Sequence, residues 1–195
     1  MKPYCKSVSN LLIAAFLLVP GVSSAAFVGT LEQLSPFPFT YTESVDFRVF
    51  GTLDDGTVAT GDVTASLSGV DLGGCQAADF AGFVPGTIAL MERGGCEFSL
   101  KVINAAAAGA VGVLIFDNFG LFPNVVFVDP TSIPALFLTQ SLGQALAQDV
   151  GIGTTVRLTV TEVPDPTVPE PGVLALIAIA LAGLRFTRPS LLPRK

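Results

Sequence analysis

The sequence predicts a mixed α/β (α+β) fold, in which a β-sheet contains one parallel β-α-β unit and packs against two helices. The prediction rests on three consecutive segments: an apolar run at Thr87–Met91, a helical pattern at Glu97–Ala108 and a second apolar run at Val111–Phe116. A strand, a helix and a strand in this order form a parallel pair with a crossover, and such crossovers are right-handed. On the residues alone, any α/β domain with such a unit satisfies the pattern.

The first strand and the helix have clear boundaries. Thr87–Met91 lies between two glycine-containing turns, as expected of a short buried strand. Four consecutive alanines give the helix a high intrinsic propensity, and Gly109 suits the left-handed position that ends a helix. One face of this helix is apolar and consists of Phe98, Val102, Ala105 and Ala106.

The segments after the helix continue the alternation of strands and helices. Val111–Phe116 is apolar on both faces, which is typical of a central parallel strand covered on both sides. Ile133–Leu138 predicts another strand, and Thr139 suits the N-cap of a second amphipathic helix at Gln140–Val150. Thr155–Thr161 alternates polar and apolar residues and predicts an edge strand.

Residues 27–68 predict further β structure before the parallel unit. Asp46–Phe50 alternates polar and apolar residues, and Leu53–Val58 contains an Asp-Gly hairpin signal. The neighbouring Asp54 and Asp55 are compatible with a calcium loop. Turn chemistry is favoured, because the further spaced carboxylates and the distal glutamate of such a loop are missing.

The turn after the first strand begins a characteristic pattern. Its residues are Arg93-Gly94-Gly95-Cys96-Glu97-Phe98, then Lys101, Asn104, Ala105 and Ala108-Gly109-Ala110. This pattern resembles the core of the protease-associated domain, and the resemblance covers residues 74–160. Ile133–Leu146 resembles the usual end of that module, with Gly143 and Leu146 in place. The resemblance implies a β-sandwich or open barrel, which with an N-terminal β extension is expected at residues 27–163.

The cysteine and histidine content bears on bonding and catalysis. If Cys5 is removed with an N-terminal signal, Cys75 and Cys96 remain and predict one disulfide in an oxidising compartment, and the resemblance implies the same bridge. The chain has no histidine, which excludes Ser-His-Asp and Cys-His catalysis. A zinc site would need further ligands beside the two cysteines. No two carboxylates have a spacing that singles them out as an acid and a base. We therefore expect no cofactor, no metal and no enzymatic activity.

The first 26 residues have the pattern of a secretory signal peptide. Lys2 and Lys6 form a positive region before the apolar run Leu11–Val19. Small residues follow, and signal peptidase is expected to cleave after Ala25 or Ala26. The sequence therefore predicts export.

The C-terminus carries a second targeting pattern. Residues 164–171 are proline-rich and extended, and residues 172–184 are apolar and precede a basic tail within 172–195. This order, with the motif Pro169-Glu170-Pro171, resembles the PEP-CTERM sorting signal. The resemblance implies processing by an exosortase-type enzyme in a Gram-negative bacterium, after a transient inner-membrane association. The alternative is an ordinary membrane anchor, although thirteen apolar residues are fewer than the about 20 that a full span needs.

The charge distribution limits the possible partners. Residues 27–168 contain four basic and fifteen acidic residues, a net charge of −11. A surface of that sign repels phosphate backbones, so we expect no nucleic-acid partner. Six basic residues flank the two apolar terminal segments, as expected of their cytoplasmic sides.

A candidate binding site lies at the turn Arg93–Cys96. The turn follows the carboxyl end of a parallel strand and is expected to face the loop Asp117–Asn124, a position where open α/β sheets bind ligands. The helix N-terminus and Arg93 favour an anionic group such as a peptide carboxylate. The alternative is a structural Arg93 that pairs with Asp117. The candidate residues are Arg93, Gly94, Gly95, Glu97, Asp117 and Asn118.

The resemblance leaves three functions open. The first is a non-catalytic module that binds a protein or peptide ligand at the cell surface or in the extracellular matrix. The second is a trans-acting accessory of a secreted peptidase. The third is a passive protein of the exopolysaccharide matrix.

Overall fold

The computed structural model describes residues 26–52, 58–71, 73–121, 123–127, 129–163 and 177–179. The chain divides into a compact unit, Ala26–Val163, and a second unit made of Met1–Ala25 and Pro164–Lys195. Residues 1–25 of the expected signal peptide, residues 53–57 of the expected hairpin and the motif at 169–171 lie outside the described residues. Within the described part of the chain, no helix is long and apolar enough to cross a membrane.

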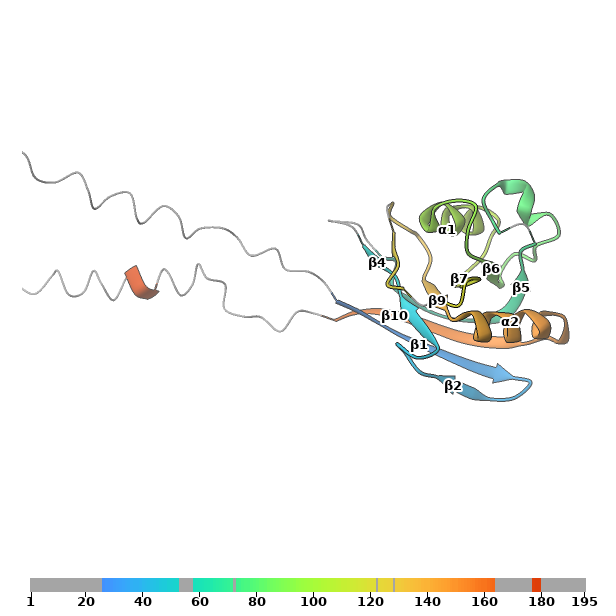
Figure 1. Cartoon of the computed structure of the whole chain (residues 1–195), viewed down its shortest axis with the longest axis horizontal. Coiled ribbons are helices and arrows are strands. Elements are labelled where there is room, and N and C mark those ends of the chain that lie inside the picture. Colours follow the sequence, from blue (N-terminus) through green and yellow to red (C-terminus); the bar gives the residue numbers. More distant parts are fainter. Residues whose placement is uncertain are drawn as a thin grey trace, which may run out of the picture. The chain divides into compact units, whose positions relative to one another are not determined.

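The compact unit contains ten strands, two α-helices and two short 3₁₀ turns among its described residues (Figure 1). In chain order they are β1 (Ala26–Ser35), β2 (Phe39–Tyr41), β3 (Phe47–Val49), β4 (Gly51–Thr52), β5 (Gly61–Gly69), η2 (Ala77–Phe80), β6 (Ile88–Glu92), α1 (Phe98–Ala107), β7 (Gly112–Phe116), β8 (Val126–Phe127), β9 (Ala135–Leu138), α2 (Gln140–Asp149), η3 (Val150–Ile152) and β10 (Thr155–Val163).

Eight of these strands form one sheet in the order β2-β1-β10-β5-β6-β7-β9-β3. The strands β5, β6, β7 and β9 are parallel, and the pairs at both ends of the sheet are antiparallel. The sheet curls so that β1 and β3, which are far apart in the strand order, come close to each other. A Cβ placed on Gly29 of β1 would lie only 2.8 Å from Cγ2 of Val49 in β3. The predicted α/β fold with an open-barrel sheet is confirmed.

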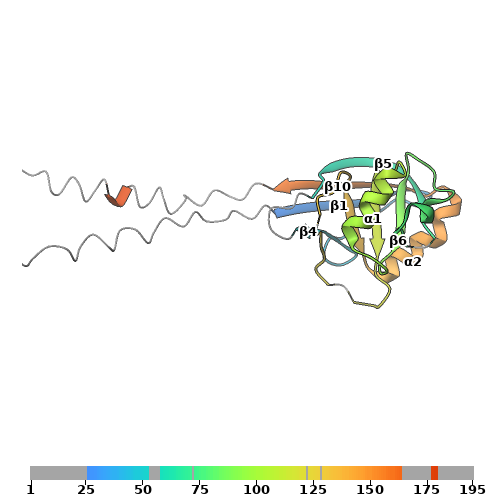
Figure 2. The same ribbon diagram turned by 90° about the horizontal axis from the view of Figure 1, so that it is seen from above.

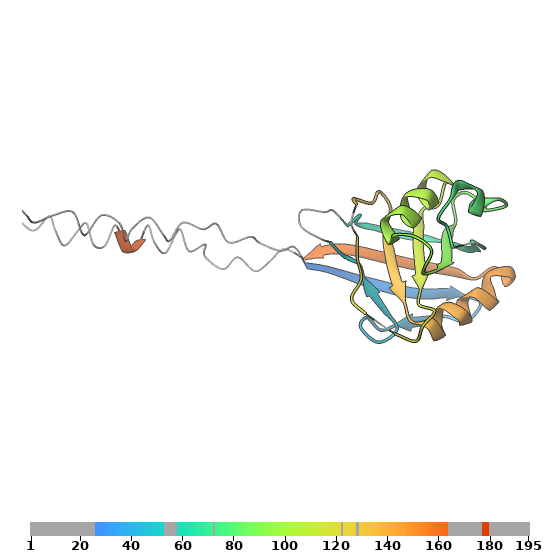
Figure 3. The same ribbon diagram turned by 45° about the horizontal axis from the view of Figure 1, so that its top comes forward.

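The predicted β-α-β unit is present as β6, α1 and β7. All β7 residues except Phe116 are buried, as expected of a strand covered on both faces. Figures 1 and 3 show α1 and α2 on opposite sides of the parallel strands. Gly109 follows α1 with φ of 89°, the left-handed conformation predicted for it. Thr139 caps α2, since its Oγ1 accepts a hydrogen bond from the Leu142 backbone N–H at 3.4 Å.

An aromatic cluster fills the space beneath α1. The Phe50 and Phe127 rings are stacked with centroids 4.2 Å apart, and Phe98 and Phe137 pack on Phe50 edge-on or tilted. All four side chains come from different segments, so the cluster joins β8, β9 and the start of α1 to the loop after β3. The cluster therefore fixes the first turn of α1 next to the turn Arg93–Cys96, called the motif turn below.

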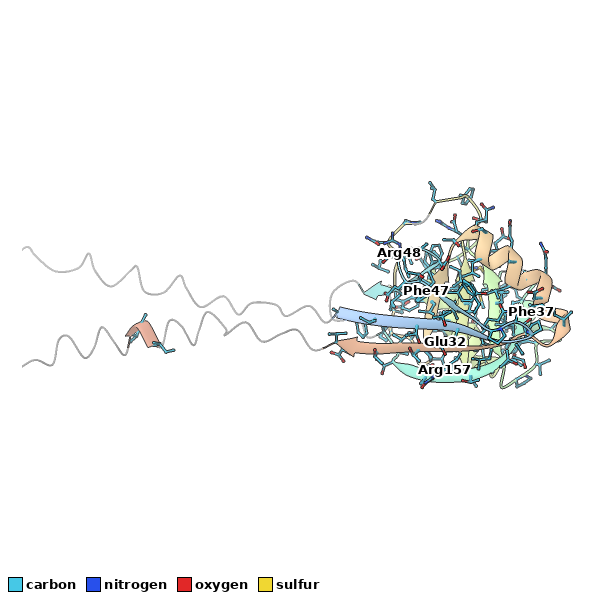
Figure 4. All side chains as sticks on the ribbon, turned by 90° about the horizontal axis from the view of Figure 1, so that it is seen from below. Glu32, Phe37, Phe47, Arg48 and Arg157 are labelled. Atoms are coloured by element: carbon cyan, nitrogen blue, oxygen red, sulfur yellow. A yellow bond between two sulfur atoms is a disulfide. The ribbon has the colours of Figure 1, made fainter. Side chains whose placement is uncertain are left out.

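The prediction of an edge strand at Thr155–Thr161 was wrong. The strand β10 is longer and lies inside the sheet, paired with β1 on one side and β5 on the other. Its outward face is polar: Arg157 forms an ion pair with Asp62 at 2.7 Å and lies 3.9 Å from Glu32 (Figure 4). An interior antiparallel strand with one face exposed to solvent alternates polar and apolar residues in the same way as an edge strand. The sequence pattern therefore did not distinguish the two positions.

The two ends of the compact unit lie side by side. Ala26 at the start of β1 pairs with Val163 at the end of β10 (Figure 2). The carboxyl end of β5 is at the other end of β10, where Ser66 pairs with Thr155. The carboxyl ends of the parallel strands are therefore distant from both domain ends.

Candidate functional site

A pocket of about 850 Å³ lies at the carboxyl ends of β5, β6 and β7. Parallel strands of open sheets commonly bind ligands at this end. Its walls combine apolar and charged residues from four segments: Gly69, Val70, Asp71, Gly73, Leu90, Met91, Glu92, Arg93, Gly94, Gly95, Phe116, Asn118, Phe119, Ala147 and Val150.

The motif turn forms one wall of this pocket and requires its two glycines. Gly94 and Gly95 have φ of 100° and 81°, a region that side chains strain. A Cβ on Gly95 would also lie 3.1 Å from Sγ of Cys75. The turn can therefore approach the neighbouring loop closely only with glycine at this position.

The predicted disulfide between Cys75 and Cys96 is confirmed, with the two Cα atoms 5.8 Å apart. It joins the loop that contains Gly73 to the motif turn, and Gly73 and Gly95 both line the pocket. Cross-linking two segments of a pocket wall limits how far they can separate. The bridge therefore holds the pocket wall together.

Lys101 and Asn104 of α1 support the same loop from behind. The Lys101 Nζ donates a hydrogen bond to the Gly73 carbonyl and lies 3.7 Å from Cys75 Sγ, while Asn104 Nδ2 donates to the Gly74 carbonyl at 3.1 Å. Lys101 is completely buried, and this burial lowers its pKa against the opposing attraction of Asp79 and Glu92.

The burial of Lys101 was not predicted. It lies beside the apolar face of the helix, and the motif pattern was its only signal in the sequence.

The Arg93 side chain is held by Asp117. Its Nη1 lies 2.7 Å from Asp117 Oδ1, and the side chains are 23% and 1% exposed. Burial alone would raise the pKa of Asp117. The hydrogen bonds from Arg93 and from the backbone N–H groups of Phe119 and Leu121, with the attraction of Arg93, outweigh burial and lower that pKa. The alternative given for Arg93, a structural ion pair with Asp117, is therefore the arrangement that the structure shows.

Two aromatic rings complete the surroundings of Arg93. Its guanidinium carbon lies 5.6 Å from the centroid of Phe119 and 5.9 Å from that of Phe137. Asn118 adds a hydrogen bond from its Nδ2 to the Arg93 carbonyl at 3.3 Å. The motif turn and the loop after β7 thus meet, as expected from the sequence.

The candidate residues occupy different positions around the pocket. Arg93, Gly94, Gly95 and Asn118 line it, whereas Asp117 lies buried behind Arg93. Glu97 is exposed at the N-cap of α1 and is not among the described lining residues. Phe119 belongs to the loop that was expected to face the turn, although it was not among the candidate residues. The sequence did not indicate Asp71, Ala147 or Val150, because these come from another loop and from the end of α2.

The comparisons with known proteins agree with this architecture. The PA domain family matches residues 59–146. The chain is 40% identical over 137 residues to an aminopeptidase of Pseudomonas aeruginosa, which covers 62% of this chain and 24% of that protein. It is 31% identical over 155 residues to vacuolar-sorting receptor 7 of Arabidopsis thaliana, covering 70% of this chain and 24% of the receptor.

Solved structures show the same fold. A zinc aminopeptidase from Bacillus subtilis superimposes with a TM-score of 0.56 at 25% identity, over 73% of this chain and 32% of that one. An aminopeptidase from an Aneurinibacillus strain gives a TM-score of 0.55 at 26% identity, over 72% of this chain and 34% of that one. The chain therefore spans about a quarter of the curated relatives and a third of these structures.

These relatives contradict the prediction that the chain is not an enzyme, since the bacterial proteins it matches are named aminopeptidases. The prediction rested on the missing histidine, which excludes particular catalytic groups within this sequence. The missing histidine excludes histidine-dependent catalytic groups in this sequence, but it does not exclude enzymatic function in general. The matched region is, moreover, only part of each aminopeptidase.

The motif turn, the curled sheet with its parallel unit and the family match over one continuous region agree with one another. Residues 59–146 of this chain are therefore a PA domain.

Proposed function

We propose that this PA domain binds a peptide segment of another protein in the pocket at the carboxyl ends of β5, β6 and β7. The observation that carries the proposal is the pocket itself, whose volume of about 850 Å³ lies in the range of ligand sites. Its walls contain apolar side chains such as Leu90 and Val150 beside exposed polar ones such as Glu92. Such a mixture suits a peptide, which presents apolar side chains and hydrogen-bonding groups together.

The rim of the pocket supports this proposal. Phe119 is 72% exposed and lines the pocket, and Leu121, two residues further along the same loop, is 64% exposed. Large apolar side chains that protrude beside a pocket are common at protein interaction sites. A bound peptide would cover them.

The proposed place of action is the cell surface or the extracellular matrix. The two terminal targeting patterns and the net charge of −11 over residues 27–168 support it. The disulfide supports it as well, because such bonds persist in oxidising compartments.

A second candidate is a domain that presents or restricts the substrate of a peptidase. The relatives favour it, since three of them are named aminopeptidases and contain the matched region as part of a longer chain. Addition of the protein to a secreted peptidase should then change the set of peptides cleaved.

The test blocks the pocket without disturbing the fold. Ala147 is an exposed α2 residue that lines the pocket, and Ala145 is an exposed residue of the same helix outside the described lining. Capture of a random peptide library by immobilised protein should be lost in Ala147→Trp and kept in Ala145→Trp. Equal capture by the two variants would place the binding surface elsewhere.

A further inference from the structure

We infer, building on the proposed function, that the pocket selects peptides that carry a cationic nitrogen, from a free amino terminus or from a basic side chain. The charges of its walls, an unfilled hydrogen-bond acceptor and the engagement of Arg93 together point to this ligand class.

Two carboxylates of the pocket wall are available to a ligand. Asp71 follows β5 and Glu92 ends β6, and both are exposed. The loop after β5 and the end of β6 adjoin: a Cβ on Gly73 would be 3.7 Å from the Glu92 carbonyl oxygen. Among the described residues, neither carboxylate takes part in an ion pair.

The positive charges near the pocket are engaged by the protein itself, and Lys101 attracts Glu92 only from behind the pocket wall. Arg93 is paired with Asp117 at 2.7 Å and contacts two aromatic rings. Lys101 is completely buried and donates to the Gly73 carbonyl, so its ammonium lies behind the wall. The accessible charge of the pocket is therefore negative, which favours a cation over the carboxylate expected from the motif alone.

Asn118 provides an independent indication. Its Oδ1 is buried and accepts no hydrogen bond from the described residues. The orientation of the amide is set by Nδ2, which donates to the Arg93 carbonyl at 3.3 Å, so Oδ1 cannot exchange places with it. An acceptor left without a donor is unfavourable. Because Oδ1 is buried, an N–H group from a ligand satisfies it only if binding uncovers the Asn118 amide.

The apolar residues of the pocket favour a ligand with an apolar group next to its cationic nitrogen. Leu90, Met91, Phe116 and Val150 line the same space as Glu92. A lysine or arginine buries its aliphatic stem against such a surface, and an amino-terminal residue buries its apolar side chain. Both sources of a cationic nitrogen therefore fit, and the experiment must distinguish them.

The probe is one short fluorescent peptide with a central phenylalanine, prepared in four forms. Its first residue is norleucine with a free amino group, acetylated norleucine, acetylated lysine or acetylated glutamate. We expect at least one cationic form to bind the full chain about tenfold more tightly than acetylated norleucine, and acetylated glutamate to bind most weakly. The better of the two cationic forms identifies the source of the nitrogen.

Two variants that remove one negative charge each provide the matched comparison. Glu92→Gln should weaken binding of the cationic peptide about fivefold, while Glu162→Gln, on the exposed end of β10, should leave it unchanged. Equal binding of all four peptides, a preference for glutamate or an equal effect of both variants would overturn the inference but not the peptide-binding function. Absence of binding by every peptide would overturn both.

Discussion

The Arg93 guanidinium contacts one carboxylate and two aromatic rings, so at the scale of the residue it is a structural element of the pocket wall. Asp117, its partner, is only 1% exposed and depends on the pair for compensation of its buried charge. The backbone of Arg93 still borders the pocket through the Asn118 amide. Arg93 thus shapes the pocket wall, while its positive charge is paired with Asp117.

Replacement of Arg93 by alanine is expected to lower the free energy of unfolding by about 3 kcal/mol, because it leaves Asp117 buried without a partner. The measurement is denaturant unfolding of wild-type protein and variant. Arg93→Ala combined with Asp117→Asn should recover part of the loss. An unchanged midpoint in Arg93→Ala would show that the pair contributes nothing to stability.

The pH dependence of stability should report the same pair. The pKa of Asp117 is lowered in the folded protein, so its stabilising contribution is present above the ordinary value of 3.8 and is lost as the pH falls below it. Wild-type protein should be more stable than Asp117→Asn at pH 7, and the difference should shrink below about pH 4. Glu162→Gln serves as the exposed control; a difference between wild type and Asp117→Asn that stays constant down to pH 2 contradicts the assignment.

At the scale of the element, α2 packs closely on β7 through Gly143. A Cβ at this position would overlap the Phe116 side chain. Gly143→Ala is therefore expected to destabilise the domain by about 3 kcal/mol or more, measured by thermal or denaturant unfolding. Gly151→Ala is the control, since no heavy atom lies within 4 Å of its added Cβ. Similar stabilities of the two variants would mean that α2 can shift away from the sheet.

The disulfide connects the two loops that form one pocket wall, and its removal should lower the free energy of unfolding. Cys75 and Cys96 are 21 residues apart, and opening a loop of this length costs about 3 kcal/mol in the chain-entropy model. Cys75→Ala with Cys96→Ala should lower the unfolding free energy by that amount. Addition of a reductant should destabilise the wild type and leave the double variant unchanged, whereas equal sensitivity of both proteins would argue against the bond.

The success of the sequence predictions also depends on the element considered. The β6-α1-β7 unit was predictable because local periodicity and flanking glycines determine it within one segment. The interior position of β10 was not, since it depends on pairing with β1, which is distant in the chain. The contact of Lys101 with the Gly73 carbonyl was also missed, because it involves a loop brought to α1 only by the tertiary fold.

At the scale of the whole molecule, the net charge of −11 over residues 27–168 and the two flanking targeting patterns lead us to propose trimming at both ends. Signal peptidase would act near Ala25 or Ala26, and an exosortase-type enzyme near Pro169-Glu170-Pro171. Intact mass of the protein released from the cell surface should match a chain shortened at both ends. A product that retains residues 191–195 would favour a simple anchor.

The pairing of Ala26 with Val163 has a consequence for how such a domain can be carried by larger proteins. Its two ends are about 5 Å apart, the spacing of neighbouring strands, so a host can accept the domain within a single surface loop without rearranging its own backbone. Because the pocket lies at the opposite end of β5 and β10, such a graft leaves the opening pointing away from the attachment. The same geometry makes the unit suitable for circular permutation, with a short linker joining its original ends.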